Sequence, residues 1–254
     1  MVSENGSRVK TTGTSFEVVD VLFEDGPSTR EHIEDRLGLT TSTVHRHLAT
    51  LQDHGYVVRV DGRYRLGFRF LTIGGSLRRG VPGYPMIKRK VDELAEKTDE
   101  RAQFIVREGH ERVYLYTEIG DNPVQTGAHT GRRGPIHASA AGKSIVANLP
   151  EDERERLLES VDLTQTGPNT ITDVDALREN LAAIRERGYA LNREESTAGV
   201  HAIGAPVMEH GDHVVGAISL SGPATRLKSD RLEEELPDLV LAAANELELH
   251  IEHS

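Results

Sequence analysis

The chain has 254 residues, of which 37% are hydrophobic and 28% charged, a composition that is ordinary for a folded globular protein. It contains no cysteine, which excludes disulfides, thiolate catalysis and cysteine-ligated zinc. The sequence has neither an apolar run of the roughly 18 residues that a spanning helix needs nor an apolar signal-peptide core near its start. We therefore expect a cytoplasmic protein without a membrane partner.

The net charge of -11 is unevenly distributed along the chain. Residues 1–80 carry 11 Arg or Lys and 10 Asp or Glu, whereas residues 81–254 carry 19 and 31. Between residues 40 and 79, seven arginines stand against two aspartates, a balance that favours contact with phosphate groups. Only six of the 30 basic residues are lysines. The acidic, lysine-poor composition favours a halophilic host, although a GC-rich genome would also favour arginine.

Residues 1–13 are polar and rich in small residues, and we expect a disordered tail there. Three short helices are predicted next, the first over 16–23. The second begins with Ser28 as N-cap and Glu31 in a capping box. The third begins at Thr40 and ends near residue 55. Its buried stripe, spaced i, i+4 and i+7, consists of Val44, Leu48 and Leu51.

A β-hairpin is predicted over 56–66, because Asp61-Gly62 supplies the positive φ angles of a two-residue turn. Three helices followed by a hairpin is the element order of a winged helix-turn-helix. We predict this domain over 14–71. Small helical bundles with a hairpin also serve as protein-interaction modules, and this alternative stays open on element order alone.

The polar face of the third helix favours DNA, since it carries short hydrogen-bond donors and an arginine without one acidic residue. The arginines of the hairpin extend the basic surface. The expected partner is therefore double-stranded DNA. The predicted DNA-binding residues are Thr41, Ser42, Thr43, His45 and Arg46 on the helix, and Arg59, Arg63 and Arg65 on the hairpin.

A linker helix and hinge are expected over 72–84, and a second domain over 85–254. Helices mixed with hairpin-like strands predict an α+β fold, in which helices cover an antiparallel sheet. Predicted helices cover 86–97 and 172–187, with others after 138, from 151 and up to about 250; predicted strands cover 104–106, 113–119, 189–191, 202–207 and 214–220, with a turn at 210–212.

The sequence Ala-Ala-Gly-Lys-Ser at 140–144 contains the end of a phosphate-binding loop pattern, but His137 stands where that pattern needs glycine. Ser139 lies two residues from His137, a spacing that places side chains on opposite faces of a strand, and no nucleophile elbow is present. None of the twelve histidines stands with the carboxylates expected of a catalytic metal site. We therefore predict no catalytic residue, no metal and no cofactor.

Ordered segments spread over about residues 14–250 resemble the IclR family of transcriptional regulators. They are 38–39, 42–46, 55–56 and 64–67 in the first half, and 131–143, 169–172, 187–190, 194–195, 199–200, 205–207, 219–223 and 226–227 in the second. The resemblance implies a GAF-like effector domain, a homodimer or homotetramer, and a partly palindromic operator.

The resemblance also implies an effector pocket. In relatives that bind glyoxylate or pyruvate, the pocket uses main-chain groups of a helix start, an acidic residue, a cysteine and two serines. The corresponding residues are Ala140, Ala141, Asn192, Ala202, Ser219 and Ser221. Because Asn192 replaces the acid and Ala202 the thiol, we expect a different effector, such as a sugar, a sugar acid, a polyol or another small organic acid. The alternative role of the two alanines at 140–141 is tight packing of helix on sheet.

Taken with the resemblance, the sequence predicts an effector-responsive DNA-binding regulator of a catabolic operon, which is not an enzyme. A different class of protein is also compatible with these elements. It is a GAF-type signalling module or enzyme that binds a ligand and uses the helical domain for protein contacts.

Overall fold

The computed structural model describes residues 9–120, 127–210, 213–228 and 230–253. The chain divides into two compact units, Met1–Arg78 and Arg79–Ser254. The division lies within the segment 72–84, where the linker and hinge were expected. In the described part of the chain, every helix is too short or too polar to cross a membrane.

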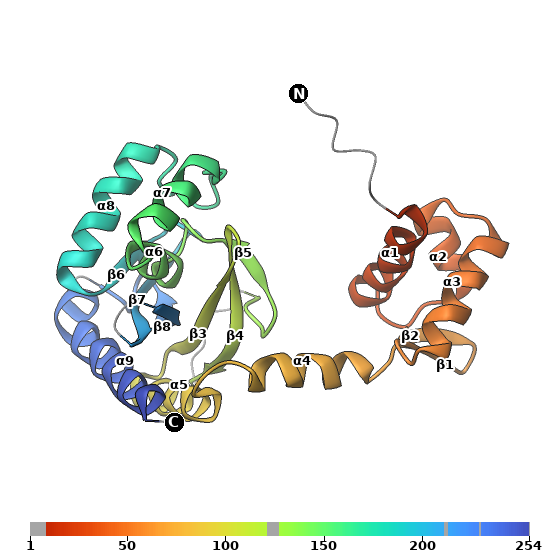
Figure 1. Cartoon of the computed structure of the whole chain (residues 1–254), viewed down its shortest axis with the longest axis horizontal. Coiled ribbons are helices and arrows are strands. Elements are labelled where there is room, and N and C mark those ends of the chain that lie inside the picture. The colour runs from red at the N-terminus through yellow and green to blue at the C-terminus, as the bar shows by residue number, and fades with distance from the viewer. Residues whose placement is uncertain (1–8, 121–126, 211–212, 229, 254) are drawn as a thin grey trace. The chain divides into compact units, whose positions relative to one another are not determined.

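The first unit is a winged helix-turn-helix (Figure 1). Its elements are α1 (Lys10–Glu24), α2 (Arg30–Leu37), α3 (Thr41–Asp53), β1 (Val57–Val60), β2 (Arg63–Leu66) and α4 (Arg69–Arg79). Apolar residues of the three helices and the hairpin form one core, with Val18, Ile33 and Val44 fully buried. The helix α4 has no buried residue.

Local patterns located α3 and the hairpin correctly. The Thr40 hydroxyl accepts a hydrogen bond from the backbone N–H of Thr43, so Thr40 is the predicted N-cap. In the antiparallel pair β1–β2, Asp61 and Gly62 have φ angles of 50° and 79°, as the predicted turn requires. Both predictions are confirmed.

Two predictions for this unit are wrong in part. Helix α1 begins at Lys10, so residues 10–13 are helical and not part of a disordered tail; residues 1–8 lie outside the described part. In this first turn the Thr14 hydroxyl donates to the Lys10 carbonyl, four residues earlier, at 3.3 Å.

The predicted N-cap of α2 is wrong by one residue. The N-cap is Thr29, whose hydroxyl accepts from the His32 N–H at 3.3 Å, and not Ser28. Ser28 is extended because its N–H and carbonyl both pair with the backbone of Tyr64 in β2, at 2.9 and 2.7 Å. Pairing with the wing thus moves the helix start by one residue.

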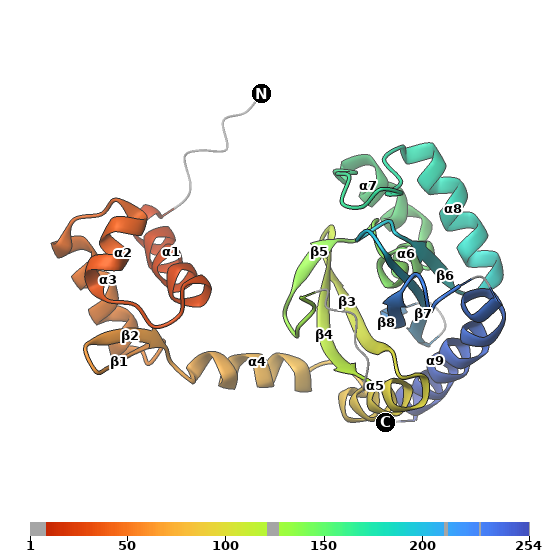
Figure 2. The same ribbon diagram turned by 180° about the vertical axis from the view of Figure 1, so that it is seen from behind.

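The second unit is an antiparallel six-stranded sheet with the order β5-β4-β3-β8-β7-β6, covered by helices on both faces (Figures 1 and 2). The strands are β3 (Arg101–Glu108), β4 (Glu111–Ile119), β5 (Arg133–Pro135), β6 (Ala190–Arg193), β7 (Val200–Glu209) and β8 (His213–Pro223). The helices are α5 (Tyr84–Thr98), α6 (Ala140–Ala147), α7 (Glu151–Ser160), α8 (Val174–Arg187), η2 (Arg231–Glu235) and α9 (Leu236–Glu252).

Two apolar cores lie on the two faces of this sheet. One joins α5 and α9 to the face that carries Phe104, Ile218 and Leu220. The other joins α6, α7 and α8 to the face that carries Ile105 and Ala217. The α+β prediction is confirmed. The short strand β5 was not predicted, and of the expected turn at 210–212 only His210 lies within the described residues.

Candidate functional site

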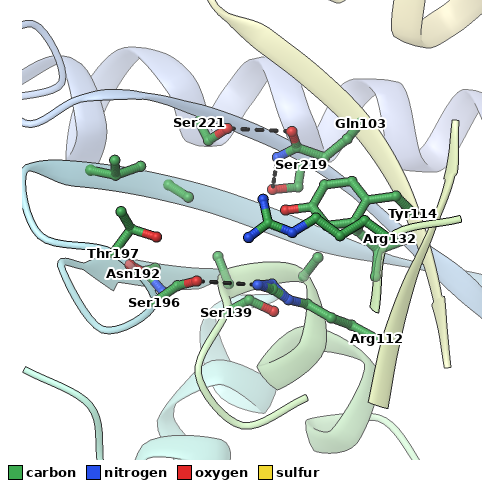
Figure 3. A pocket seen from close by; sticks show the side chains of 15 residues that line it. Gln103, Arg112, Tyr114, Arg132, Ser139, Asn192, Ser196, Thr197, Ser219 and Ser221 are labelled. Atoms are coloured by element: carbon green, nitrogen blue, oxygen red, sulfur yellow. Dashed lines mark hydrogen bonds between the residues drawn. The ribbon is translucent and has the colours of Figure 1, made fainter. Parts of the chain in front are cut away.

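A cavity of about 50 Å³ lies between the sheet and the first turn of α6 (Figure 3). Its walls come from β3, β4, β6, β7, β8 and the segment that follows β6. The lining residues are Gln103, Ile105, Arg112, Tyr114, Arg132, Ser139, Ala140, Ala141, Asn192, Ser196, Thr197, Val200, Ala202, Ser219 and Ser221. The structure thus brings all six residues predicted to bind an effector to one cavity. Seven further polar lining residues were not predicted.

The start of α6 closes one side of the cavity. Ser139 caps the helix by accepting from the Gly142 N–H at 3.0 Å. Ala140 and Ala141 follow in the first turn, where backbone N–H groups have no partner within the helix and the helix dipole favours an anion. Strand β7 approaches closely here, since a Cβ on Gly204 would lie 2.9 Å from the Ala141 nitrogen. The two alanines therefore also allow the tight packing of helix on sheet that was their alternative predicted role.

Asn192 has both ends of its carboxamide bonded to the backbone. Its Nδ2 donates to the Ala138 carbonyl at 2.7 Å, and its Oδ1 accepts from the Glu195 N–H at 3.2 Å. The residue is 2% exposed. It therefore ties β6 to the start of α6 and to the segment after β6, and so fixes the shape of the cavity wall.

Ser219 and Ser221 lie on the cavity side of β8, while Leu220 between them belongs to the core under α5 and α9. This confirms the predicted alternation. Both hydroxyls are hydrogen-bonded to Gln103 of the neighbouring strand β3: its Nε2 donates to Ser219 at 3.0 Å, and Ser221 donates to its Oε1 at 3.3 Å. Gln103 was not predicted from the sequence, because only the β3–β8 register places it opposite Ser219.

The opposite end of the cavity is cationic. Arg112 of β4 is 8% exposed, and its Nη2 donates to the Ser196 hydroxyl at 3.2 Å. Within the described ranges, its Nε has no hydrogen-bond partner, and no carboxylate forms an ion pair with the Arg112 side chain. Burial lowers the pKa of Arg112, and the charge of the neighbouring Arg132 lowers it further, against an opposing effect of Tyr114. A buried cation without a counter-charge is costly, so this end of the cavity suits an anion.

The lysine of the Ala-Ala-Gly-Lys-Ser segment has a structural role behind the cavity. The Lys143 Nζ donates to both carboxylate oxygens of Glu195 at 2.6 Å. Burial lowers the pKa of Lys143, and the Glu195 carboxylate opposes that shift. The pair connects α6 to the segment that carries Ser196 and Thr197 on the cavity wall.

In the first unit, the surroundings of the polar face of α3 differ from the prediction in one respect. The Thr41 hydroxyl donates to the Glu34 carboxylate of α2 at 2.9 Å, so an acid from another helix adjoins a face that has none of its own. The Ser42 and Thr43 hydroxyls bond to Thr40. His45 and Arg46 are exposed, and they are the residues of this face best placed to reach a partner.

The predicted arginines of the wing fall into two groups. Arg59 and Arg63 are exposed; Arg59 lies over the Tyr64 ring at 5.4 Å, and Arg63 donates to the Pro27 carbonyl at 3.2 Å. Arg65 is half-buried and donates to the Leu66 carbonyl at 3.1 Å. The first two arginines are therefore accessible on the wing, whereas the Arg65 guanidinium lies over the ring of Phe68, just before α4.

Metal coordination has no support in the part of the chain that the structure describes, where no group of three or more His, Asp or Glu could hold an ion. Hydrogen-bonding side chains line both ends of the cavity, an arrangement that suits the binding of a polar ligand.

Comparison with known proteins agrees with this architecture. Residues 85–249 match the family model "Bacterial transcriptional regulator IclR C-terminal", and residues 14–68 match the model "HVO_A0261 N-terminal domain". The chain is 35% identical over 249 residues to the probable HTH-type transcriptional regulator ArcR of Halobacterium salinarum, covering 96% of this chain and 95% of that one.

Two solved structures share the fold over 96% of this chain and all of their own length. The IclR of Thermotoga maritima has a TM-score of 0.85 and 28% identity. An IclR homolog of Microbacterium hydrocarbonoxydans, complexed with 4-hydroxybenzoate, has a TM-score of 0.78 and 26% identity.

Proposed function

The chain belongs to the IclR family of helix-turn-helix transcriptional regulators, and we propose that it controls a catabolic operon by sensing a small acid in the cavity beside α6. The observation that carries this proposal is Arg112, a buried guanidinium without a counter-charge among the described residues, which lines that cavity. Its position beside the start of α6 adds a second attraction for an anion. The 4-hydroxybenzoate of the Microbacterium homolog is likewise a carboxylate.

The DNA-binding half of the proposal rests on α3 and the wing. His45 and Arg46 lie exposed near the start of α3, the part of a recognition helix that contacts base edges. Arg59 and Arg63 are exposed on the wing and suit phosphate or minor-groove contacts. The other predicted residues, Thr41, Ser42, Thr43 and Arg65, have local hydrogen bonds that would have to be exchanged for contacts with DNA.

The same unit offers a surface for a second copy of the chain. Five large apolar side chains on and beside α1 and α4 are at least 64% exposed; they are Phe16, Phe23, Phe68, Leu71 and Leu77. Large apolar side chains are costly to leave in water, and a partner that covered these five would remove that cost. A partly palindromic operator has two half-sites and needs a two-fold protein. We therefore propose that the first units pair through these residues in a homodimer, or in each half of a homotetramer.

The test compares the wild type with Arg112→Met, using fluorescence anisotropy on DNA from upstream of the gene. A panel of small organic acids and sugars is added to both proteins. We expect the variant to bind DNA like the wild type when no effector is present. The acid that changes DNA binding by the wild type should no longer change DNA binding by the variant. The matched control is Arg107→Met, because Arg107 lies on β3 but forms its ion pair with Glu153 outside the cavity.

Three results would count against the proposal. A normal acid response in Arg112→Met would place the sensor elsewhere. A response only to neutral sugars would contradict an acidic effector. Absence of sequence-specific DNA binding would favour the rival class, a ligand-binding signalling module whose helical domain contacts proteins.

A further inference from the structure

One carboxamide organises the serine side of the cavity, away from the bond between Arg112 and Ser196. Gln103 is 4% exposed, and it bonds to two serines that are 2% and 9% exposed, Ser219 and Ser221. It donates to the first through Nε2 and accepts from the second through Oε1. Figure 3 shows both bonds, with the three side chains grouped apart from the bond between Arg112 and Ser196.

This arrangement gives the two hydroxyls opposite hydrogen-bonding roles toward the cavity. A serine hydroxyl has one proton and two lone pairs. Ser221 uses its proton on Gln103, so it can only accept a hydrogen bond from a ligand. Ser219 accepts from Gln103 and keeps its own proton, so it can donate. A carboxamide has one donor end and one acceptor end. Turning it over would exchange the roles of the two serines, so that one hydroxyl would still donate to a ligand and the other would still accept.

The Arg112 guanidinium offers only donors to a ligand, because it has no acceptor. A carboxylate satisfies Arg112, which has no counter-charge in the described part of the chain. A ligand that also satisfies the serine end must both accept and donate there. A ligand hydroxyl does both. A ketone or aldehyde oxygen only accepts, so its lone pairs would face the lone pairs of the serine that can only accept.

We propose that the effector is a small hydroxy acid, and that Gln103 is the residue that selects a hydroxyl over a carbonyl group. The inference rests on the proposed function and adds a chemical class to it. It separates the effector from keto acids, which carry the same charge, and from neutral polyols, which lack the carboxylate.

The experiment measures binding of D-lactate, L-lactate, pyruvate and glycerol to the full chain by isothermal titration calorimetry. Lactate and pyruvate have the same charge and the same number of carbons, and they differ in a hydroxyl against a carbonyl. We expect one enantiomer of lactate to bind about tenfold more tightly than pyruvate, since an unsatisfied buried hydroxyl oxygen is costly. Glycerol should show no binding, because it leaves Arg112 unpaired.

Gln103→Met keeps the length of the side chain and removes both bonds to the serines. Each hydroxyl can then donate or accept, so the ratio of lactate to pyruvate affinity should fall to about one. Folding of this variant is checked by its thermal unfolding and by its DNA binding without effector. Ser219→Ala and Ser221→Ala provide a second test. Loss of the accepting hydroxyl should weaken the binding of lactate alone, whereas loss of the donating hydroxyl should weaken the binding of both acids.

The outcomes separate this inference from the proposed function. If neither acid binds the wild type, the acid-sensing cavity itself is wrong and the inference falls with it. If pyruvate binds as tightly as lactate, the cavity stands and the hydroxy-acid preference is overturned. A preference for lactate that survives both in Gln103→Met and in the two serine variants would overturn the role of Gln103.

Discussion

The ammonium group of Lys143 lies 2.6 Å from both carboxylate oxygens of Glu195, in a pair that is almost completely buried. The lysine belongs to α6, whose first turn closes the cavity, and the glutamate precedes Ser196 and Thr197 on the cavity wall. Two walls of the proposed effector site are thus held by one ion pair. Removing one partner of such a pair leaves the other charge buried and alone.

We therefore expect Lys143→Met to lower the free energy of unfolding by about 3–5 kcal/mol, measured by urea denaturation. Adding Glu195→Gln to Lys143→Met should restore part of the loss, because the isolated carboxylate is then removed. The matched control is Arg178→Met, which breaks an ion pair with Glu155 at the surface and should change stability far less. Equal losses in the two single variants would contradict the buried character of the Lys143 pair.

Some features of this protein could be predicted from sequence because they are set by neighbouring residues. The cap at Thr40 and the turn at Asp61-Gly62 depend only on local backbone chemistry. The alternation around Leu220 follows from the two-residue period of a strand. The small residues of the α6 start and the two serines were located through the family resemblance.

Other features depend on contacts between segments that are distant in sequence. Gln103 meets Ser219 only through the register of β3 on β8, more than a hundred residues away. Arg112 reaches the cavity from β4, and nothing in its own sequence neighbourhood marks it as buried. Ser28 carries a good capping signal, yet pairing with Tyr64 overrides it.

For DNA recognition, we expect Arg46→Ala to cost about 1–3 kcal/mol of operator affinity, because an exposed arginine near the start of α3 suits a base edge. The comparison is Arg63→Ala on the wing, which should weaken binding to the operator and to unrelated DNA alike. It should also lower the slope of log affinity against log salt concentration by about one. Anisotropy titrations at several salt concentrations measure both effects. If Arg63→Ala weakens only the operator while Arg46→Ala acts on all DNA, the roles of helix and wing are reversed.

The proposed pairing of the first units can be tested at Leu77, which is 71% exposed on α4. A charge at a buried apolar interface is unfavourable, so Leu77→Glu should shift the protein toward smaller assemblies and weaken operator binding. Sedimentation analysis at several concentrations measures the shift. Leu249→Glu is the control, because Leu249 is an equally apolar, 59% exposed residue on α9 of the other unit. If Leu249→Glu reduced the size of the assembly and Leu77→Glu did not, the interface would lie on the second unit.

The last prediction concerns the acid limit of stability and rests on His137, which is 1% exposed. Its Nε2 lies 3.2 Å from the Thr164 carbonyl, while its Nδ1 has no hydrogen-bond partner within the described residues. Burial lowers the pKa of His137 below its ordinary value of 6.5; the Thr164 bond and Asp162 oppose this shift, and Lys143 and Arg112 add to it. In the folded chain His137 therefore stays unprotonated at a pH at which the same side chain is already protonated in the unfolded chain.

Because the unfolded state then holds more protons, the stability of the wild type should fall as the pH drops below 6.5 toward the folded-state pKa of His137. His137→Asn removes this contribution, so its free energy of unfolding should change less than that of the wild type between about pH 7 and about pH 5. The control is His54→Asn at the exposed end of α3, which should follow the wild type. Parallel pH profiles for the wild type and His137→Asn would show that His137 is not the group that loses stability in acid.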